Sequence, residues 1–120
     1  MGCSVFGTEA ARKRGEKMRG KPLTPEAQLT RSIRYVLKMA GCFHWKQWQG
    51  LGSFPGVSDI LGIWQGKLLA IEIKAPKGNI SDHQQVFIDR INAEGGLAFV
   101  ARDIDTVIEK LGLQDRFLIR

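Results

Sequence analysis

The sequence predicts an α/β fold in which a small mixed β-sheet is flanked by helices, with the element order αβββαβα. Residues 57–74 read as two apolar strands joined by a Gln65-Gly66 turn, which indicates an antiparallel hairpin. Residues 97–101 form a wholly apolar run, as expected for a strand buried on both faces in a parallel pairing. Because segments of helical period surround these strands, we expect helices to cover the sheet.

The first helix is predicted from its start and stop signals. Thr24 is suited to the N-cap, Pro25 to the first helical position and Glu26 to the first turn. Apolar residues then recur at helical spacing at Leu29, Ile33, Val36, Leu37 and Ala40. Gly41 supplies a stop, so the helix is expected to span about 25 to 40.

An aromatic strand and a glycine-rich loop are expected next. Residues 42–48 alternate enough to form a strand. Trp45 and Trp48 could stack on nucleic-acid bases, but packing in the core or against the hairpin is the interpretation we prefer in so small a domain. The loop at 49–56 either lets the backbone approach a phosphate or simply turns the chain.

The segment after the hairpin begins with a turn at 75–79. Ser81 and Gln84 have the spacing of a capping box, so a helix is expected to start there and to end at Gly95-Gly96. Its apolar face is predicted to comprise Val86, Phe87, Ile88 and Ile91.

A last helix is expected to open at residues 103–106. Its inward-pointing side chains are predicted to be Ile104, Val107, Ile108 and Leu111. Residues 117–119 are apolar enough to dock on the body of the protein or on another subunit.

Three charged residues interrupt the apolar hairpin. If Gln65-Gly66 is a two-residue loop, the register places Asp59 opposite Glu72, with Cβ atoms roughly 5 Å apart. Lys74 projects to the same face as Glu72 because strand side chains alternate. Two carboxylates and an amine are therefore predicted to converge at one end of the hairpin.

Opposed carboxylates are destabilising unless one holds a proton or a cation lies between them. A divalent metal resolves this conflict, and oxygen ligands suit Mg²⁺ or Mn²⁺. Lys74 would then orient a water molecule or stabilise charge on a phosphate. The alternative is that Glu72 and Lys74 form a solvated edge and that Asp59 opens a turn.

Two further polar residues have local explanations. Glu26 is a first-turn acid that the helix dipole favours. Gln84 completes the capping box without any chemical role. On local evidence alone we prefer these structural interpretations.

The net charge of +6 is concentrated near the N-terminus. Residues 1–21 hold six basic residues against Glu9 and Glu16, a net charge of +4, so the remaining 99 residues carry only +2. We expect a flexible basic arm at 1–21 and one folded domain at 22–120. The arm would contact nucleic-acid phosphates, although solvated basic tails without a function are also common. The candidate DNA contacts are Arg12, Lys13, Arg14, Lys17, Arg19 and Lys21, together with Lys77 after the hairpin.

Several classes of protein and site are disfavoured. No run approaches the 18 or so apolar residues of a membrane span, and no secretory leader is evident, so a cytoplasmic location is expected. Cys3 and Cys42 support neither a disulfide framework nor a zinc site. His44 and His83 lack zinc-ligand spacing and are expected to be structural or surface groups. The glycine-rich loop lacks the spacing of nucleotide cradles, so no nucleotide cofactor is expected.

These motifs together resemble the PD-(D/E)xK nuclease superfamily and, within it, the virus-type replication-repair nuclease (VRR-NUC) family. The matching elements are Glu26, Pro55-Gly56-Val57-Ser58-Asp59, Ile71-Glu72-Ile73-Lys74 and Ser81-x-x-Gln84. The resemblance covers residues 24–112. One departure is that Asp59 follows Pro55 after three intervening residues rather than directly.

The resemblance implies a phosphodiesterase that depends on Mg²⁺ or Mn²⁺. It implies that Asp59, Glu72 and the backbone carbonyl of Ile73 bind the metal, and that Lys74 acts on the attacking water or the phosphate. Glu26 would hold a metal-bound water or a second metal. Gln84 would orient Lys74 or contact the phosphate, which is compatible with its capping role.

The leading hypothesis is a structure-selective DNA endonuclease. Stand-alone viral and bacterial members of the family resemble Holliday-junction resolving nucleases and act as homodimers, which implies branched DNA in a bacterial or phage-infected cell, with roles in repair and recombination. The alternative is a non-catalytic DNA-binding module that retains the nuclease fold. A sequence-specific restriction-type enzyme is a weaker third hypothesis, because the chain leaves little room for a target-recognition domain.

Overall fold

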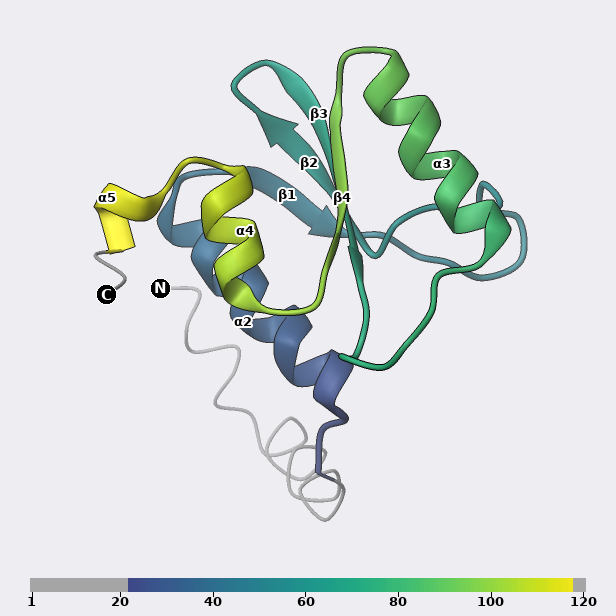
Figure 1. The fold of residues 1–120 in the computed structure, drawn as a ribbon, viewed down its shortest axis with the longest axis horizontal. Helices are drawn as coiled ribbons and strands as arrows, with labels where there is room; N and C mark the ends of the chain where they lie inside the picture. The colour runs from purple at the N-terminus through teal and green to yellow at the C-terminus, as the bar shows by residue number, and fades with distance from the viewer. Residues whose placement is uncertain (1–21, 118–120) are drawn as a thin grey trace, which may run out of the picture.

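A computed structural model describes residues 22–117 of the chain. Its elements, labelled as in Figure 1, are α2 (Pro25–Met39), β1 (Phe43–Lys46), β2 (Ile60–Trp64), β3 (Lys67–Ile73), α3 (Asp82–Ala93), β4 (Leu97–Ala101), α4 (Ile104–Lys110) and α5 (Gln114–Phe117). The predicted α/β class and the order αβββαβα are therefore confirmed, with the short α5 added at the end. The basic arm expected at residues 1–21 lies outside the described residues.

The four strands form one mixed sheet in the order β1-β2-β3-β4. β1 and β3 both run antiparallel to β2, whereas β3 and β4 are parallel. The predicted hairpin register is confirmed, since Trp64 pairs with Lys67 and Ile60 with Ile71. Gln65 and Gly66 both have positive φ, at 51° and 79°, as a type I′ turn requires.

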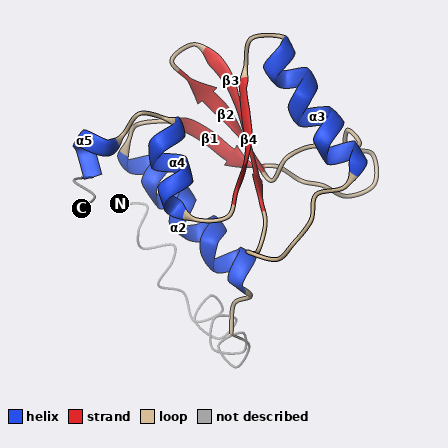
Figure 2. Ribbon diagram, viewed as in Figure 1, coloured by secondary structure: helices blue, strands red, loops and turns tan. Residues whose placement is uncertain are grey.

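Helices cover the sheet on both faces, with α2, α4 and α5 on one side and α3 on the other (Figures 1 and 2). On the α2 face, alternate strand residues such as Ile60, Leu69, Ile71 and Phe99 join Leu37 and its helical neighbours in the larger buried cluster. α2 begins as predicted, because the Thr24 hydroxyl accepts a hydrogen bond from the Ala27 N–H at 3.1 Å. This face forms most of the core.

The α3 face contains a smaller cluster. Ala70, Ile88 and Ala98 are its buried members. The capping box of α3 is confirmed, since Ser81 Oγ accepts from the Gln84 N–H and Gln84 Oε1 accepts from the Ser81 N–H. At the other end of the helix, the Asn92 side-chain amide makes two hydrogen bonds of 2.9 Å with the backbone of Ala98. α3 is thus tied to β4 and leaves much of β1 and β2 uncovered.

The packing of the two tryptophans and of Val86 differs in part from the prediction. Trp45 was expected in the core or against the hairpin, and it pairs with Leu61 of the hairpin strand β2 but is 38% exposed, because no helix covers the α3 face of the edge strand β1. Trp48, which follows β1, is 62% exposed. Val86 is exposed because α3 turns Ile88 toward the sheet instead. No helix in the described part of the chain is long and apolar enough to cross a membrane.

Candidate active site

Asp59 and Glu72 lie together at one end of the sheet. Asp59 directly precedes β2 and Glu72 lies near the end of β3, so extending the observed register by one pair places them opposite each other. Asp59 Oδ2 accepts a hydrogen bond of 2.7 Å from the Ile73 N–H. This bond fixes the Asp59 carboxylate against β3. The convergence that the hairpin predicts is therefore present in the structure.

Glu72 is a buried carboxylate, with only 2% of its surface exposed. Burial, followed by the adjacent Asp59 carboxyl, raises the pKa of Glu72 from its ordinary value of 4.5 to about 8. Lys74 opposes this shift, and Glu26 adds a smaller electrostatic increase. In the absence of a cation, Glu72 therefore holds a proton at neutral pH.

Gln84 and Lys74 both contact the same oxygen of Glu72. Gln84 Nε2 donates to Glu72 Oε2 at 3.0 Å, and Lys74 Nζ lies 3.9 Å from that oxygen. Gln84 uses its carbonyl oxygen for the capping box and its amide nitrogen for Glu72. The two interpretations offered for Gln84 are thus compatible, although it contacts Glu72 rather than orienting Lys74 directly.

Glu26 reaches the site from the first turn of α2. Its Oε2 accepts a hydrogen bond of 3.2 Å from the Ala75 N–H, which joins residues 49 positions apart. Glu26 therefore holds the start of the turn that follows Lys74. Its carboxylate is one of the charges that raise the pKa of Glu72.

Arg102 is a contributor that sequence analysis missed. Its guanidinium donates to the carbonyl oxygens of Ala75 at 2.8 Å and Gly78 at 2.6 Å, and so pins the turn after Lys74. A signal was available, because Arg102 directly follows β4. The carboxyl ends of parallel strands meet at one edge of a sheet, which places Arg102 beside the end of β3.

The glycine-rich loop and the start of α3 enclose a hollow next to Gln84. Its volume is about 540 Å³, and its lining includes Ser53, Gly56, His83 and Gln84. Gly56 has a φ of 78°, and a Cβ there would overlap the backbone carbonyl of His83. Glycine is therefore required where the loop touches the first turn of α3. Because Gln84 also contacts Glu72, the hollow adjoins the carboxylate pair.

The chemistry of the pair fits a divalent cation. Glu72 Oε1 is buried and has no hydrogen-bond partner, so one acceptor beside Asp59 is left unsatisfied. No group of three or more His, Cys, Asp or Glu side chains within residues 22–117 is arranged to hold a metal. Mg²⁺ commonly uses one or two carboxylates and retains several waters. Asp59, Glu72 and the carbonyl of Ile73 thus provide the type and number of oxygen ligands that Mg²⁺ commonly uses in proteins.

The remaining candidate residues are not brought to this site by any observed contact. Lys77 is exposed in the turn after β3. The six basic residues of the arm, Arg12, Lys13, Arg14, Lys17, Arg19 and Lys21, lie outside the described residues. Ser58 is a second missed feature, because its hydroxyl is buried beside Asp59 without a hydrogen-bond partner.

Comparison with known proteins identifies the domain. Residues 17–103 match the sequence profile of the VRR-NUC domain, which is well over half of the chain. This chain belongs to the VRR-NUC family. A solved structure described as a VRR_NUC domain is similar over 76% of this chain and 98% of its own length, with a TM-score of 0.64 and 20% sequence identity. No curated protein matches significantly.

Membership of the VRR-NUC family establishes the broad activity class. The family implies a nuclease of the PD-(D/E)xK type, and hence DNA as the substrate. Such nucleases generally use a divalent metal. The structural match shows the same fold.

Proposed function

We propose that this VRR-NUC protein is a metal-dependent DNA endonuclease that acts on branched DNA such as Holliday junctions. The observation that carries the proposal is the Asp59–Glu72 pair, in which Glu72 is buried and Asp59 partly buried, with Lys74 3.9 Å from Glu72 and one Glu72 oxygen unsatisfied. Two adjacent carboxylates, one of them buried, are unfavourable for folding alone. A bound cation would offset the repulsion between the two carboxylates.

The residues divide the chemistry as follows. Asp59, Glu72 and the Ile73 carbonyl would hold Mg²⁺ or Mn²⁺, which supplies Lewis-acid stabilisation of charge on the phosphate and lowers the pKa of a bound water. Gln84 and Lys74 occupy the Oε2 side of Glu72, which leaves Oε1 free as a ligand. The proton on Glu72 must leave before the carboxylate can bind a cation.

Lys74 is positioned for the phosphate or the attacking water. Its side chain is 18% exposed, compared with 3% for Glu72, so the ammonium group can reach the substrate while remaining near the pair. Glu26 accepts a hydrogen bond from the Ala75 N–H at the start of the 75–78 turn, where it would hold an outer water or a second metal. Lys77 and the arm residues would contribute nonspecific phosphate contacts.

The experiment is cleavage of end-labelled four-way junctions, flaps, linear duplex and single strands with Mg²⁺ or Mn²⁺. We expect Glu72→Gln to abolish cleavage, because the amide keeps the shape but removes the charged ligand. Lys74→Ala should lower turnover by about a hundredfold or more with DNA binding retained. Exposed Lys67 provides a matched control, and Lys67→Ala should cleave normally.

The outcomes separate the hypotheses. Symmetric nicks in junctions that vanish in Glu72→Gln would support a resolving nuclease. If linear duplex is cleaved as fast as junctions, the nuclease activity is supported and the preference for branched DNA is rejected. Junction binding without cleavage in any metal would favour the non-catalytic binding module.

A homodimer is part of the proposal because symmetric cleavage of a junction needs two sites. Phe43, Ile63 and Leu68 form a cross-strand row on the uncovered α3 face and are 70%, 44% and 37% exposed. Trp45 extends the row along β1. These four residues form an apolar strip. In a two-fold dimer, the strip of one subunit would pack against the same strip of the other.

Light scattering after size exclusion tests the dimer. Phe43→Ser with Ile63→Ser should shift the mass from dimer to monomer. Val86→Ser removes an exposed apolar side chain from α3 and serves as the control. A monomeric wild-type protein at micromolar concentration would refute this part of the proposal.

A further inference from the structure

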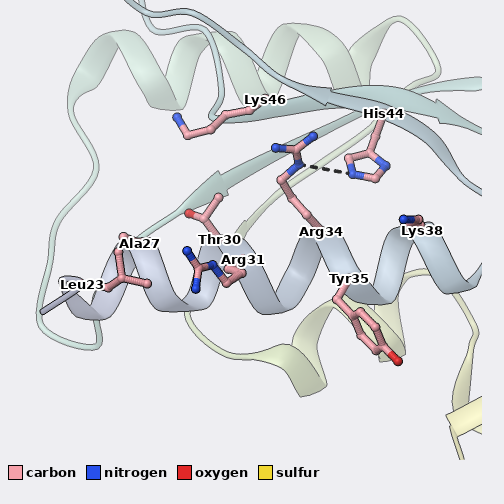
Figure 3. A pocket seen from close by; sticks show the side chains of 9 residues that line it. All are labelled: Leu23, Ala27, Thr30, Arg31, Arg34, Tyr35, Lys38, His44 and Lys46. Carbon is pink, nitrogen blue, oxygen red and sulfur yellow. Dashed lines mark hydrogen bonds between the residues drawn. The ribbon is translucent and has the colours of Figure 1, made fainter. Parts of the chain in front are cut away.

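A basic groove lies between α2 and the edge strand β1. Its volume is about 490 Å³, and four cations line it, namely Arg31, Arg34, Lys38 and Lys46. No acidic residue contributes to the lining. Figure 3 shows Arg34 extending from α2 toward His44 on β1, with Lys46 nearby on the strand side. The groove therefore collects positive charge from two elements.

The cations of α2 are spaced along one side of the helix. Arg31, Arg34 and Lys38 are three and four residues apart, which places them on one face. Seven residues of helix span about 10 Å. Projected on the DNA axis, this length corresponds to about three phosphates of one strand, at about 3.4 Å of axial rise each. Lys46 adds a charge from the opposite wall.

Arg34 contacts His44 across the groove. His44 Nδ1 lies 2.9 Å from the carbonyl oxygen of Cys42, which can only accept. Arg34 Nε donates to His44 Nε2 at 3.4 Å. The two terminal nitrogens of Arg34 make no hydrogen bond within residues 22–117, so they are available for a bidentate contact with a phosphate.

The charges of the groove are not balanced by carboxylates. Within the described residues the ion pair observed is Lys74 with Glu72, and none of the four groove cations has an acidic partner. All four are exposed, so none is held there by the core. An anionic occupant fits best.

One end of the groove lies near the start of β2, beside Asp59 in the sequence but on the opposite face of the sheet. Lys46 pairs with Ile60, next to Asp59, and the Gln47 N–H donates to the Asp59 carbonyl at 2.8 Å. On the other wall, Ala27 follows Glu26. Lys46 and His44 project to the α2 face, whereas Phe43 and Trp45 project to the α3 face with the carboxylates. DNA in the groove would thus continue around the sheet edge toward Asp59 and Glu72.

We propose that this groove binds the phosphodiester backbone of duplex DNA that flanks the cleaved bond. The inference rests on the proposed nuclease function and adds where an arm of the substrate is held. The contacts are to phosphates, so they position DNA without reading its sequence. The groove is separate from the metal-binding carboxylates, so its loss weakens binding rather than chemistry.

The test is binding of a short fluorescent DNA duplex in EDTA, measured by anisotropy over a range of salt concentrations. Arg34→Ala with Lys46→Ala should weaken binding at least about tenfold and reduce the slope of log K against log salt by about 2. The matched control, Lys67→Ala with Arg90→Ala, removes the same charges from exposed positions outside the groove. Circular dichroism verifies that both proteins are folded.

A cleavage assay completes the test. The groove variant should have a higher KM for duplex or junction DNA and the same kcat at saturation. Arg34→Lys, which keeps the charge, should bind more tightly than the groove variant. Equal weakening in the groove and control variants would overturn the groove as a specific site, as would unchanged binding. Wild-type protein that binds duplex through the groove but never cleaves DNA would reject the nuclease function and not the groove.

Discussion

The two faces of the sheet differ in how completely they are buried and in what they hold. The α2 face packs a large apolar cluster from α2, α4, β2, β3 and β4. The α3 face buries far fewer apolar side chains and holds Asp59, Glu72 and the exposed apolar strip on β1, β2 and β3. The comparison indicates that one face supplies most of the stability, while the other tolerates charges that folding alone does not favour.

Truncating a core side chain on each face should give the largest difference in the free energy of unfolding. Leu37 is fully buried on the α2 face, so Leu37→Ala should reduce the free energy of unfolding by about 2–5 kcal/mol. Ile88→Ala on the α3 face should cost less, because the small cluster around it collapses more readily. Urea unfolding monitored by circular dichroism measures both. An equal cost for the two variants would contradict the division of stability between the faces.

The pH dependence of stability should expose the strain in the carboxylate pair. The pKa of Glu72 is raised to about 8 in the folded protein, so folding favours its protonated form. The stabilisation from this proton is fully present below the ordinary pKa of 4.5 and is lost as the pH rises through about 8. We expect the Tm of metal-free protein to fall across this window.

Two comparisons sharpen the pH experiment. Glu72→Gln cannot ionise, so its Tm should be flatter over the same pH range. Mn²⁺ should raise the Tm of the wild-type protein, and the increase should grow toward pH 8, because a cation binds the carboxylate only after the proton leaves. A Tm of the metal-free protein that rises from pH 5 to 8 in proportion to Glu72 ionisation would contradict the inferred pKa direction.

The contact between the glycine-rich loop and α3 should give an intermediate effect. Gly56→Ala adds a Cβ that overlaps the His83 carbonyl and strains a positive φ, so we expect a loss of about 1–3 kcal/mol. Gly52 also has a positive φ, but no atom lies within 4 Å of its Cβ position, so Gly52→Ala should cost less. Thermal denaturation compares them. Equal losses would show that backbone strain alone sets the cost.

Gln84 should give the smallest change in stability. Gln84→Ala removes half of the capping box, which costs about 1 kcal/mol or less, and also frees Glu72 Oε2. Gln84→Glu retains the capping acceptor but adds a third carboxylate beside Glu72, so it should lower stability further as the pH rises. Thermal melts at pH 6 and pH 8 separate these effects. Identical behaviour of the two variants would contradict the Gln84–Glu72 contact.

Much of the fold was predictable because its signals are local. The Gln65-Gly66 turn sets the hairpin register, and the Thr24 and Ser81 caps set the helix starts. A two-residue loop allows one pairing, so Asp59 had to face Glu72. The candidate site was predictable to the extent that its residues lie on this hairpin or at a capped helix start.

The order of elements, the strand register and the meeting of Asp59, Glu72 and Lys74 follow from local signals in the sequence. Three features depend on how the elements pack together: Glu26 contacts Ala75, Arg102 pins the following turn and Trp45 stays exposed. The same packing also brings α2 and β1 together around the basic groove. The physical reason is range: turns and caps act over a few residues, whereas the placement of a helix on a sheet depends on side chains from the whole chain.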